Sequence, residues 1–134
     1  MDVAFQSANT ASGAFCDLTV VDVSGSVATS YASKLFADYG ATVINVEPPD
    51  GFHTRRLRPM LSSGDSAMHG YLHANKYSVL ASRSLFQDEP VANKADLVIF
   101  DPEHLPNSDY LADINTNTCA VSWHGLTGRY SNFK

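Results

Sequence analysis

The sequence lacks any long apolar run, and this absence excludes several classes of protein. No stretch approaches the ~20 consecutive apolar residues that a membrane-spanning helix needs. The chain begins MDVAFQSANTASGAF, which has neither the basic start nor the apolar segment of a secretory signal peptide. We therefore expect a soluble, cytoplasmic protein without a membrane partner.

Cysteine is scarce, and its positions argue against a metal or redox motif. Cys16 and Cys119 are the only two cysteines, and neither belongs to a CxxC pair or to a spacing typical of metal ligands. Two reduced thiols or one disulfide would both satisfy this count. Because a reducing cytosol disfavours disulfides, we interpret both residues as reduced thiols in the core.

Basic residues are fewer than acidic residues. The chain has 9 Lys and Arg against 14 Asp and Glu, which gives a net charge of −5. This balance argues against a nucleic-acid-binding protein, which is usually basic. It does not exclude a small ligand with phosphates, because a local patch can oppose the total charge. The clearest such patch consists of Arg55, Arg56 and Arg58.

Residues Leu18 to Pro49 have the pattern of a β-strand, a helix and a second strand. The first strand ends at a turn containing Gly25. From Val27 onward apolar residues recur every fourth position, so one stripe of the following helix is apolar. Gly40 suits the end of that helix, because glycine readily adopts positive φ. Short connections of this kind favour a right-handed crossover between parallel strands.

The remaining chain repeats strands and connections. We expect residues 1–13 to be a loose lead-in and residues 14–134 to form one domain, large enough for a single core. Asp50 to Ser63 has loop composition, and Asp65 would cap a short helix that reaches about Ala74 with Met68, Tyr71 and Leu72 inward. Further elements are predicted at Tyr77–Ala81 (strand), Ser84–Lys94 (short or irregular helix), Asp96–Asp101 (strand), Asn107–Asn115 (helix) and Thr118–Trp123 (strand). The fold class is therefore α/β, with a Rossmann-like, mostly parallel sheet of about five strands and short or irregular crossovers.

Ligands of such folds bind at the carboxyl ends of the strands. Each predicted strand end is therefore a candidate site: Ser24–Ala28, Glu47–Asp50, Ala81–Ser84, Asp101–His104 and Trp123–Gly128. For Asp22 and Ser24 a ligand role and ordinary turn chemistry are equally compatible with the pattern.

Motifs for common chemistries are missing or incomplete. The turn after the first strand, SGSVATS, has one glycine where a dinucleotide site would have GxGxxG, and Glu47, where a ribose-binding acid would lie, is typical of a solvated strand end. No GxSxG is present, which argues against a hydrolase of that class. His69 and His73 share one helix face and could bind a metal, but without a third ligand they are typical of a solvated helix face.

Several blocks of the sequence resemble the N-terminal segment of family III CoA-transferases. Asp22 and Ser24 match the family's Asp-x-Ser strand end, and the helix and second strand match its Tyr-Ala, Leu-x-Ala-Asp-x-Gly-Ala and Val-Glu-Pro-Pro blocks. These blocks correspond to Tyr31–Ala32, Leu35–Ala41 and Val46–Pro49. Fainter similarities follow at Asn75–Val79, Lys94–Asp96 and Ser122–Tyr130, so the resemblance extends from Leu18 over most of the chain.

The resemblance implies a CoA-binding domain of an acyl-CoA transferase. In that family the domain is Rossmann-like, two chains interlock, and CoA lies across the strand ends. It implies CoA contacts at Val27, Ala28, Pro48, Ala81, Ser82, Arg83, Ser84, Asp101, Pro102 and Glu103. Either Arg55 and Arg83 bind the CoA phosphates and offset the carboxylates of Asp101 and Glu103, or these carboxylates weaken CoA binding. The implied partners are a CoA thioester and the rest of the enzyme or a partner chain, with a homodimer as a further option.

The sequence also departs from the family. The nucleophilic aspartate follows the Thr-Gly-x-Tyr segment, and no residue here matches it, so we expect no turnover by this chain alone. Two carboxylates at the fourth strand end would repel phosphates. Two alternatives therefore stand beside a CoA-binding domain: a degenerate packing or dimerisation module of the same fold, and a nucleotide-binding oxidoreductase domain.

Overall fold

The computed structural model describes residues 13–80, 94–105, 115–131 and 133. Within these ranges five parallel strands form one sheet in the order β3-β2-β1-β4-β5. The elements are β1 (Thr19–Asp22), α1 (Val27–Asp38), β2 (Thr42–Glu47), a 3-10 turn η1 (His53–Arg56), α2 (Ala67–Leu72), β3 (Tyr77–Leu80), β4 (Leu97–Phe100) and β5 (Asn117–Ala120). The predicted α/β fold with a Rossmann-like sheet is confirmed. The expected helices at 84–94 and 107–115 and the lead-in at 1–13 fall largely outside the described residues.

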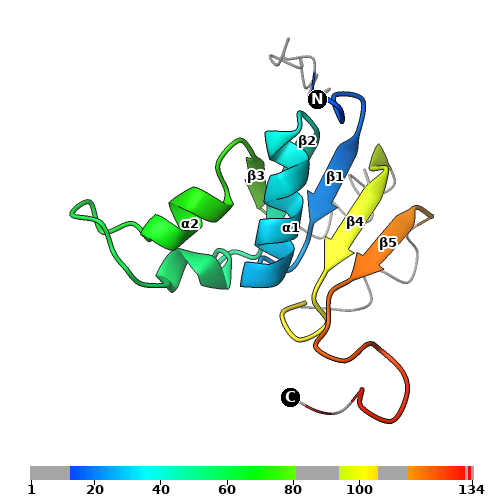
Figure 1. Cartoon of the computed structure of the whole chain (residues 1–134). Coiled ribbons are helices and arrows are strands. Elements are labelled where there is room, and N and C mark those ends of the chain that lie inside the picture. The colour runs from blue at the N-terminus through cyan, green and yellow to red at the C-terminus, as the bar shows by residue number, and fades with distance from the viewer. Residues whose placement is uncertain (1–12, 81–93, 106–114, 132, 134) are drawn as a thin grey trace.

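The sheet is held by apolar side chains on both of its faces. Val21, Ile44 and Val98 belong to the cluster on one face, and Val20 and Val43 belong to the cluster beneath α1. Strands covered on both sides favour continuous apolar runs, and β4, with the sequence LVIF, shows this pattern. In Figure 1, α1 lies in front of the sheet and α2 lies beside α1.

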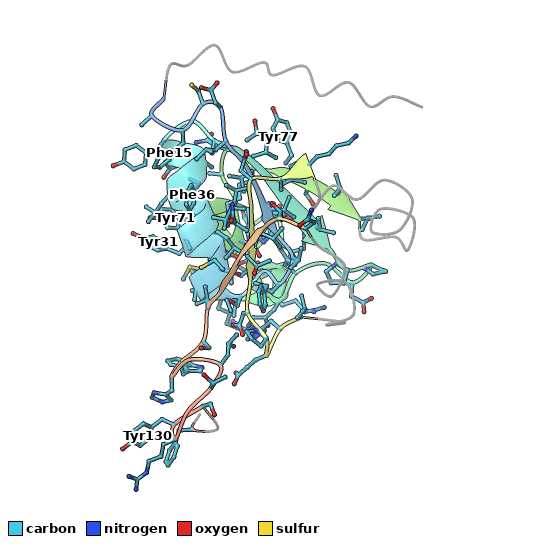
Figure 2. All side chains as sticks on the ribbon, turned by 90° about the vertical axis from the view of Figure 1, so that its right-hand side faces the viewer. Phe15, Tyr31, Phe36, Tyr71, Tyr77 and Tyr130 are labelled. Carbon is cyan, nitrogen blue, oxygen red and sulfur yellow. The ribbon has the colours of Figure 1, made fainter. Side chains whose placement is uncertain are left out.

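Helix α1 presents its apolar stripe to the outside. Tyr31, Leu35 and Tyr39 are 48%, 44% and 58% exposed, whereas the small residues Ser30 and Ser33 are fully buried against the sheet. Figure 2 shows that aromatic side chains line the outer side of this helix. The helix boundaries follow ordinary rules, since the Ser26 side chain accepts a hydrogen bond from the Thr29 amide and Gly40 has a φ of 100° just beyond the end.

Several local predictions were wrong. Ser66, and not Asp65, caps α2, because the Ser66 side chain accepts the His69 amide proton at 3.1 Å. Of the three residues expected inward on that helix, only Leu72 is buried, and Met68 and Tyr71 are exposed. The cysteines are free, as expected of reduced thiols, but both are exposed and not in the core. Among the described residues, no helix is long and apolar enough to cross a membrane.

Candidate functional site: a cavity at the strand ends

The strand order reverses between β1 and β4, and a cavity lies beyond this point. The chain continues from β1 to β2 on one side of this point and from β4 to β5 on the other side. In open α/β sheets this is the position where ligands bind. In Figure 1 the segments that follow β1, β4 and β5 all leave the lower edge of the sheet.

The cavity has a volume of about 610 Å³, within the range of small-molecule sites. Its lining comes from the α1 N-terminus, η1 and the segments after β4 and β5. The residues are Ser26, Val27, Ala28, Tyr31, His53, Asp101, Glu103, His104, Val121, Ser122 and Trp123. Apolar and aromatic side chains form one part of this lining and ionisable side chains form the other. Such a cavity can accept a flat, apolar group beside hydrogen-bonding groups.

The turn before α1 is fixed by a buried carboxylate. Asp22 Oδ1 accepts hydrogen bonds from the amides of Ser24 and Gly25 at 3.2 and 3.1 Å, and Ser33 Oγ donates to Oδ2 at 3.1 Å. Burial raises the pKa of Asp22, although these hydrogen bonds and the charge of Lys76 oppose that effect. The hydrogen bonds of the fully buried Asp22 side chain are therefore those of a residue that holds a turn together.

Gly25 is required at this turn for two reasons. Its φ of 59° is a conformation that side chains other than glycine rarely adopt. A Cβ atom at this position would also lie 2.0 Å from Cγ of Phe52, whose ring is buried. The single glycine of the SGSVATS segment therefore permits close packing of the turn against Phe52.

The end of β4 carries an acidic cluster at the cavity. The Asp101 amide donates to Ser24 Oγ at 2.9 Å, which ties this strand end to the turn after β1. The Asp101 carboxylate lies 3.0 Å from His104 Nδ1 and accepts the Glu103 amide proton at 2.9 Å. The rings of His104 and His53 are 5.9 Å apart. The cavity mouth thus combines two carboxylates with two imidazoles.

Arg55 is engaged with Glu47 at the end of β2. Its guanidinium donates two hydrogen bonds of 2.6 Å to the two Glu47 carboxylate oxygens. Burial alone would raise the pKa of Glu47, but the hydrogen bonds from Arg55, Ser78 and the Phe52 amide lower it to about 2. The expectation that Glu47 is a solvated strand end was wrong, because this residue is 2% exposed and paired.

His69 and His73 belong to a hydrogen-bond chain and not to a solvated face, so that interpretation was also wrong. Asn45 Nδ2 lies 2.8 Å from His73 Nδ1, and Thr54 Oγ1 lies 3.0 Å from His73 Nε2 and 2.9 Å from His69 Nδ1. Burial lowers the pKa of His73 to about 3, and the charge of Lys76 contributes in the same direction. His73 is therefore neutral at physiological pH, with one nitrogen accepting and the other donating.

Lys76 lies beneath α1 among buried polar groups. Its ammonium donates to the Ser30 carbonyl at 2.7 Å and to Ser33 Oγ at 2.8 Å. Burial lowers its pKa to about 8, although the nearby charge of Asp22 acts in the opposite direction. These contacts hold α1 to the sheet and bring no cation to the cavity.

The structure brings together part of the predicted site. Val27, Ala28, Asp101 and Glu103 line the cavity, and Pro102 lines a smaller pocket of about 210 Å³ that shares Glu103 and Trp123 with it. Pro48 follows β2 outside the cavity lining, and Arg55 bonds to Glu47. The predicted contacts Ala81, Ser82, Arg83 and Ser84 lie outside the described residues.

Other lining residues were missed as site residues. Tyr31, His53, Val121 and Ser122 were not predicted to bind a ligand, although His104 and Trp123 fall within the predicted strand ends. The rule that ligands lie at carboxyl ends could have found Val121, which directly follows β5. His53 comes from a loop whose path the sequence does not specify.

Comparison with known proteins identifies relatives of one family. Residues 16–82 match CoA-transferase family III. A 58-residue segment is 41% identical to the succinyl-CoA:mesaconate CoA-transferases of Haloarcula hispanica and Haloarcula marismortui. This segment covers 43% of the chain but 15% of each relative.

Solved structures agree over a longer range. A CAIB/BAIF family protein from Brucella suis is 26% identical with a TM-score of 0.65, covering 85% of this chain and 34% of the other. A hypothetical protein from Mycobacterium tuberculosis is 25% identical with a TM-score of 0.66, covering 89% of this chain and 36% of the other. The chain thus spans about a third of these structures.

Proposed function

The chain belongs to CoA-transferase family III, and we propose that its cavity at the strand ends binds part of a CoA thioester. The observation that supports this best is the position of the cavity at the point where the strand order reverses, with Val27 and Ala28 of α1 in its wall. The Haloarcula relatives are named for reactions of CoA thioesters. The proposed ligand is therefore CoA or an acyl-CoA, bound as a substrate.

The cavity fits the adenine of CoA better than its phosphates. Tyr31, Val121 and Trp123 offer apolar and aromatic surface against which a flat ring can pack. Asp101 and Glu103 are negatively charged and offer phosphate groups no favourable partner. We infer that the adenine enters the cavity and that the phosphates extend away from this acidic side.

The proposal concerns binding and not the covalent step. The family resemblance assigns the nucleophilic carboxylate to no residue of this sequence, so we expect no CoA transfer by the chain alone. The acyl donor and acceptor would be bound by other polypeptide segments. We also expect the protein to act in the cytoplasm, where CoA thioesters would be its substrates.

A second candidate is a packing module that retains the fold without binding CoA. Two observations favour it: the carboxylates at the cavity mouth, and the bidentate pair in which Arg55 is held by Glu47. A predicted phosphate-binding cation thus already has a partner.

Calorimetric titration of the chain with CoA, and separately with NAD, distinguishes these functions. We expect heat of binding with CoA and none with NAD, which a dinucleotide-binding domain would bind. Ala28→Phe should weaken CoA binding at least tenfold, because the exposed Ala28 lies in the cavity wall and phenylalanine would fill the space. Ala74→Phe, an exposed alanine beyond α2, is the matched control. An affinity that Ala28→Phe leaves unchanged would contradict the proposed site, and the absence of CoA binding would favour the packing module.

A further inference from the structure

The acidic side of the cavity has no part in binding either the face of the adenine ring or the phosphates of CoA. Asp101 and Glu103 lie in the cavity wall, where their charges repel phosphate groups. An adenine also has a polar edge, on which an amino group donates hydrogen bonds and a neighbouring ring nitrogen accepts them. The groups that bind this edge decide which base the cavity accepts.

We propose that the Glu103 carboxylate accepts a hydrogen bond from the adenine amino group and makes the cavity selective for adenine over bases with an oxygen at that position. The inference rests on the proposed function, because it assigns a residue to a ligand that the cavity must first bind. It deepens that function, since it gives the acidic side of the cavity a role in recognising the base.

The segment that carries Glu103 is held in place by Asp101. Asp101 Oδ1 accepts the Glu103 amide proton at 2.9 Å, and Oδ2 lies 3.0 Å from His104 Nδ1. The Asp101 amide donates to Ser24 Oγ at 2.9 Å, which joins the segment to the turn after β1. These contacts fix the backbone from which the Glu103 side chain extends, and a selective hydrogen bond requires such support.

Glu103 and Trp123 lie together at the boundary of two hollows. Both residues line the cavity of about 610 Å³ and also the smaller pocket of about 210 Å³. They follow β4 and β5, which are neighbours in the sheet, and the Trp123 side chain is 76% exposed, so its ring is open to a ligand. One residue thus offers a surface for the face of a base, and the other offers an acceptor for its amino group.

The carboxylate has the capacity for this additional bond. An ionised carboxylate has about four acceptor positions, so Glu103 can accept a proton from a ligand as well as from a partner within the chain. The other polar groups of the lining suit the ring nitrogen beside the amino group. His53 and Ser122 both carry groups that can donate a hydrogen bond to it. The cavity therefore combines an acceptor with donors, as the edge of adenine requires.

Hypoxanthine would fit this arrangement poorly. It has the ring system of adenine but an oxygen in place of the amino group, and that oxygen only accepts hydrogen bonds. The oxygen would face the negative charge of Glu103 without a proton between them. Sites that form a hydrogen bond to an NH group of a ligand discriminate strongly against analogues without it.

Calorimetric titration at neutral pH with CoA and with its hypoxanthine analogue tests the inference. The wild-type chain should bind CoA roughly tenfold or more tightly than the analogue. In Glu103→Gln the two affinities should differ by less than about threefold, because a glutamine amide can turn to offer its oxygen to adenine or its NH₂ group to hypoxanthine. A purely structural role of Glu103 would lower both affinities and leave their ratio unchanged.

Asp17→Asn is the matched control. It removes one negative charge from an exposed carboxylate just before β1, at the opposite edge of the sheet from the cavity. This variant should keep the selectivity of the wild type. An equal loss of selectivity in Asp17→Asn and Glu103→Gln would assign the effect to net charge and overturn the inference.

The remaining outcomes separate this inference from the proposed function. Equal affinity of the wild type for both ligands would refute recognition by Glu103 and leave CoA binding in place. Selectivity that persists in Glu103→Gln would place the recognition on another residue, which also overturns the inference. Absence of CoA binding would instead refute the proposed function, and the inference with it.

Discussion

Replacing Arg55 with alanine should destabilise the fold, because it removes the charged partner of a buried carboxylate. The Glu47 side chain is 3% exposed, and the hydrogen bonds that it accepts lower its pKa from 4.5 to about 2. A shift of this size corresponds to about 3 kcal/mol, which is an upper bound for the contribution of Arg55. Because the Arg55 side chain is 46% exposed and Ser78 still bonds to Glu47, we reduce this to about 2 kcal/mol at pH 7.

The effect of this substitution should depend on pH in one direction. The pKa of Glu47 is depressed in the folded state, so the stabilisation is complete above pH 4.5 and is lost as the pH falls toward 2. Urea unfolding followed by circular dichroism should therefore show a smaller difference between wild type and Arg55→Ala at pH 3 than at pH 7. Arg56→Ala, in the same 3-10 turn and exposed, is the control. Equal losses from both substitutions, or a difference that does not narrow in acid, would refute this explanation.

Two further substitutions test the packing of the turn and the histidine chain. Gly25→Ala should lower the free energy of unfolding by roughly 2–4 kcal/mol, because it adds backbone strain and a clash with Phe52. Gly64→Ala is the control for strain alone, because Gly64 also has a positive φ but no atom lies within 4 Å of an added Cβ. Equal losses of unfolding free energy in the two variants would contradict the clash. The pKa of His73 is about 3 in the folded state, against 6.5 for an ordinary histidine. Between these pH values the imidazole is protonated in the unfolded state but not in the folded state. The free energy of unfolding should therefore fall as the pH drops from 6.5 toward 3. His73→Gln should reduce this pH dependence, measured by urea unfolding at several pH values, whereas substitution of the exposed His124 by glutamine should leave it in place. If the unfolding free energy of His73→Gln changes with pH as steeply as that of the wild type, His73 is not the group responsible.

The strands were predictable because central strands of a parallel sheet leave a strong trace in sequence. Val20 and Val21 point to opposite faces and both are fully buried, and the LVIF run of β4 contains no polar residue. The position of Gly40 was predictable for a similarly local reason, because many helices end with a residue of positive φ and glycine adopts this angle readily. The order of the strands was not predicted, because pairing of β1 with β4 depends on residues far apart in the chain.

The candidate site was predictable only where it follows the strand ends. Val27 begins the helix after β1, Asp101 directly follows β4, and both line the cavity. The role of Arg55 was not predictable, because its sequence position suits phosphate binding and carboxylate pairing equally. Only the approach of Glu47, eight residues away, distinguishes the two in the structure.

The orientation of α1 connects these results. A periodic apolar stripe shows that a helix has one apolar side but does not show what that side contacts. Here the strands change character toward their carboxyl ends, where Asp22 and Glu47 replace valine on the face under the helices. Those carboxylates need hydrogen-bond donors, and Ser33 supplies one only if the polar side of α1 faces the sheet. The apolar side is consequently left outside, where Tyr31 is 48% exposed and forms part of the cavity lining. The same buried carboxylates that organise the strand ends thus determine which side of α1 is packed against the sheet and which side stays exposed.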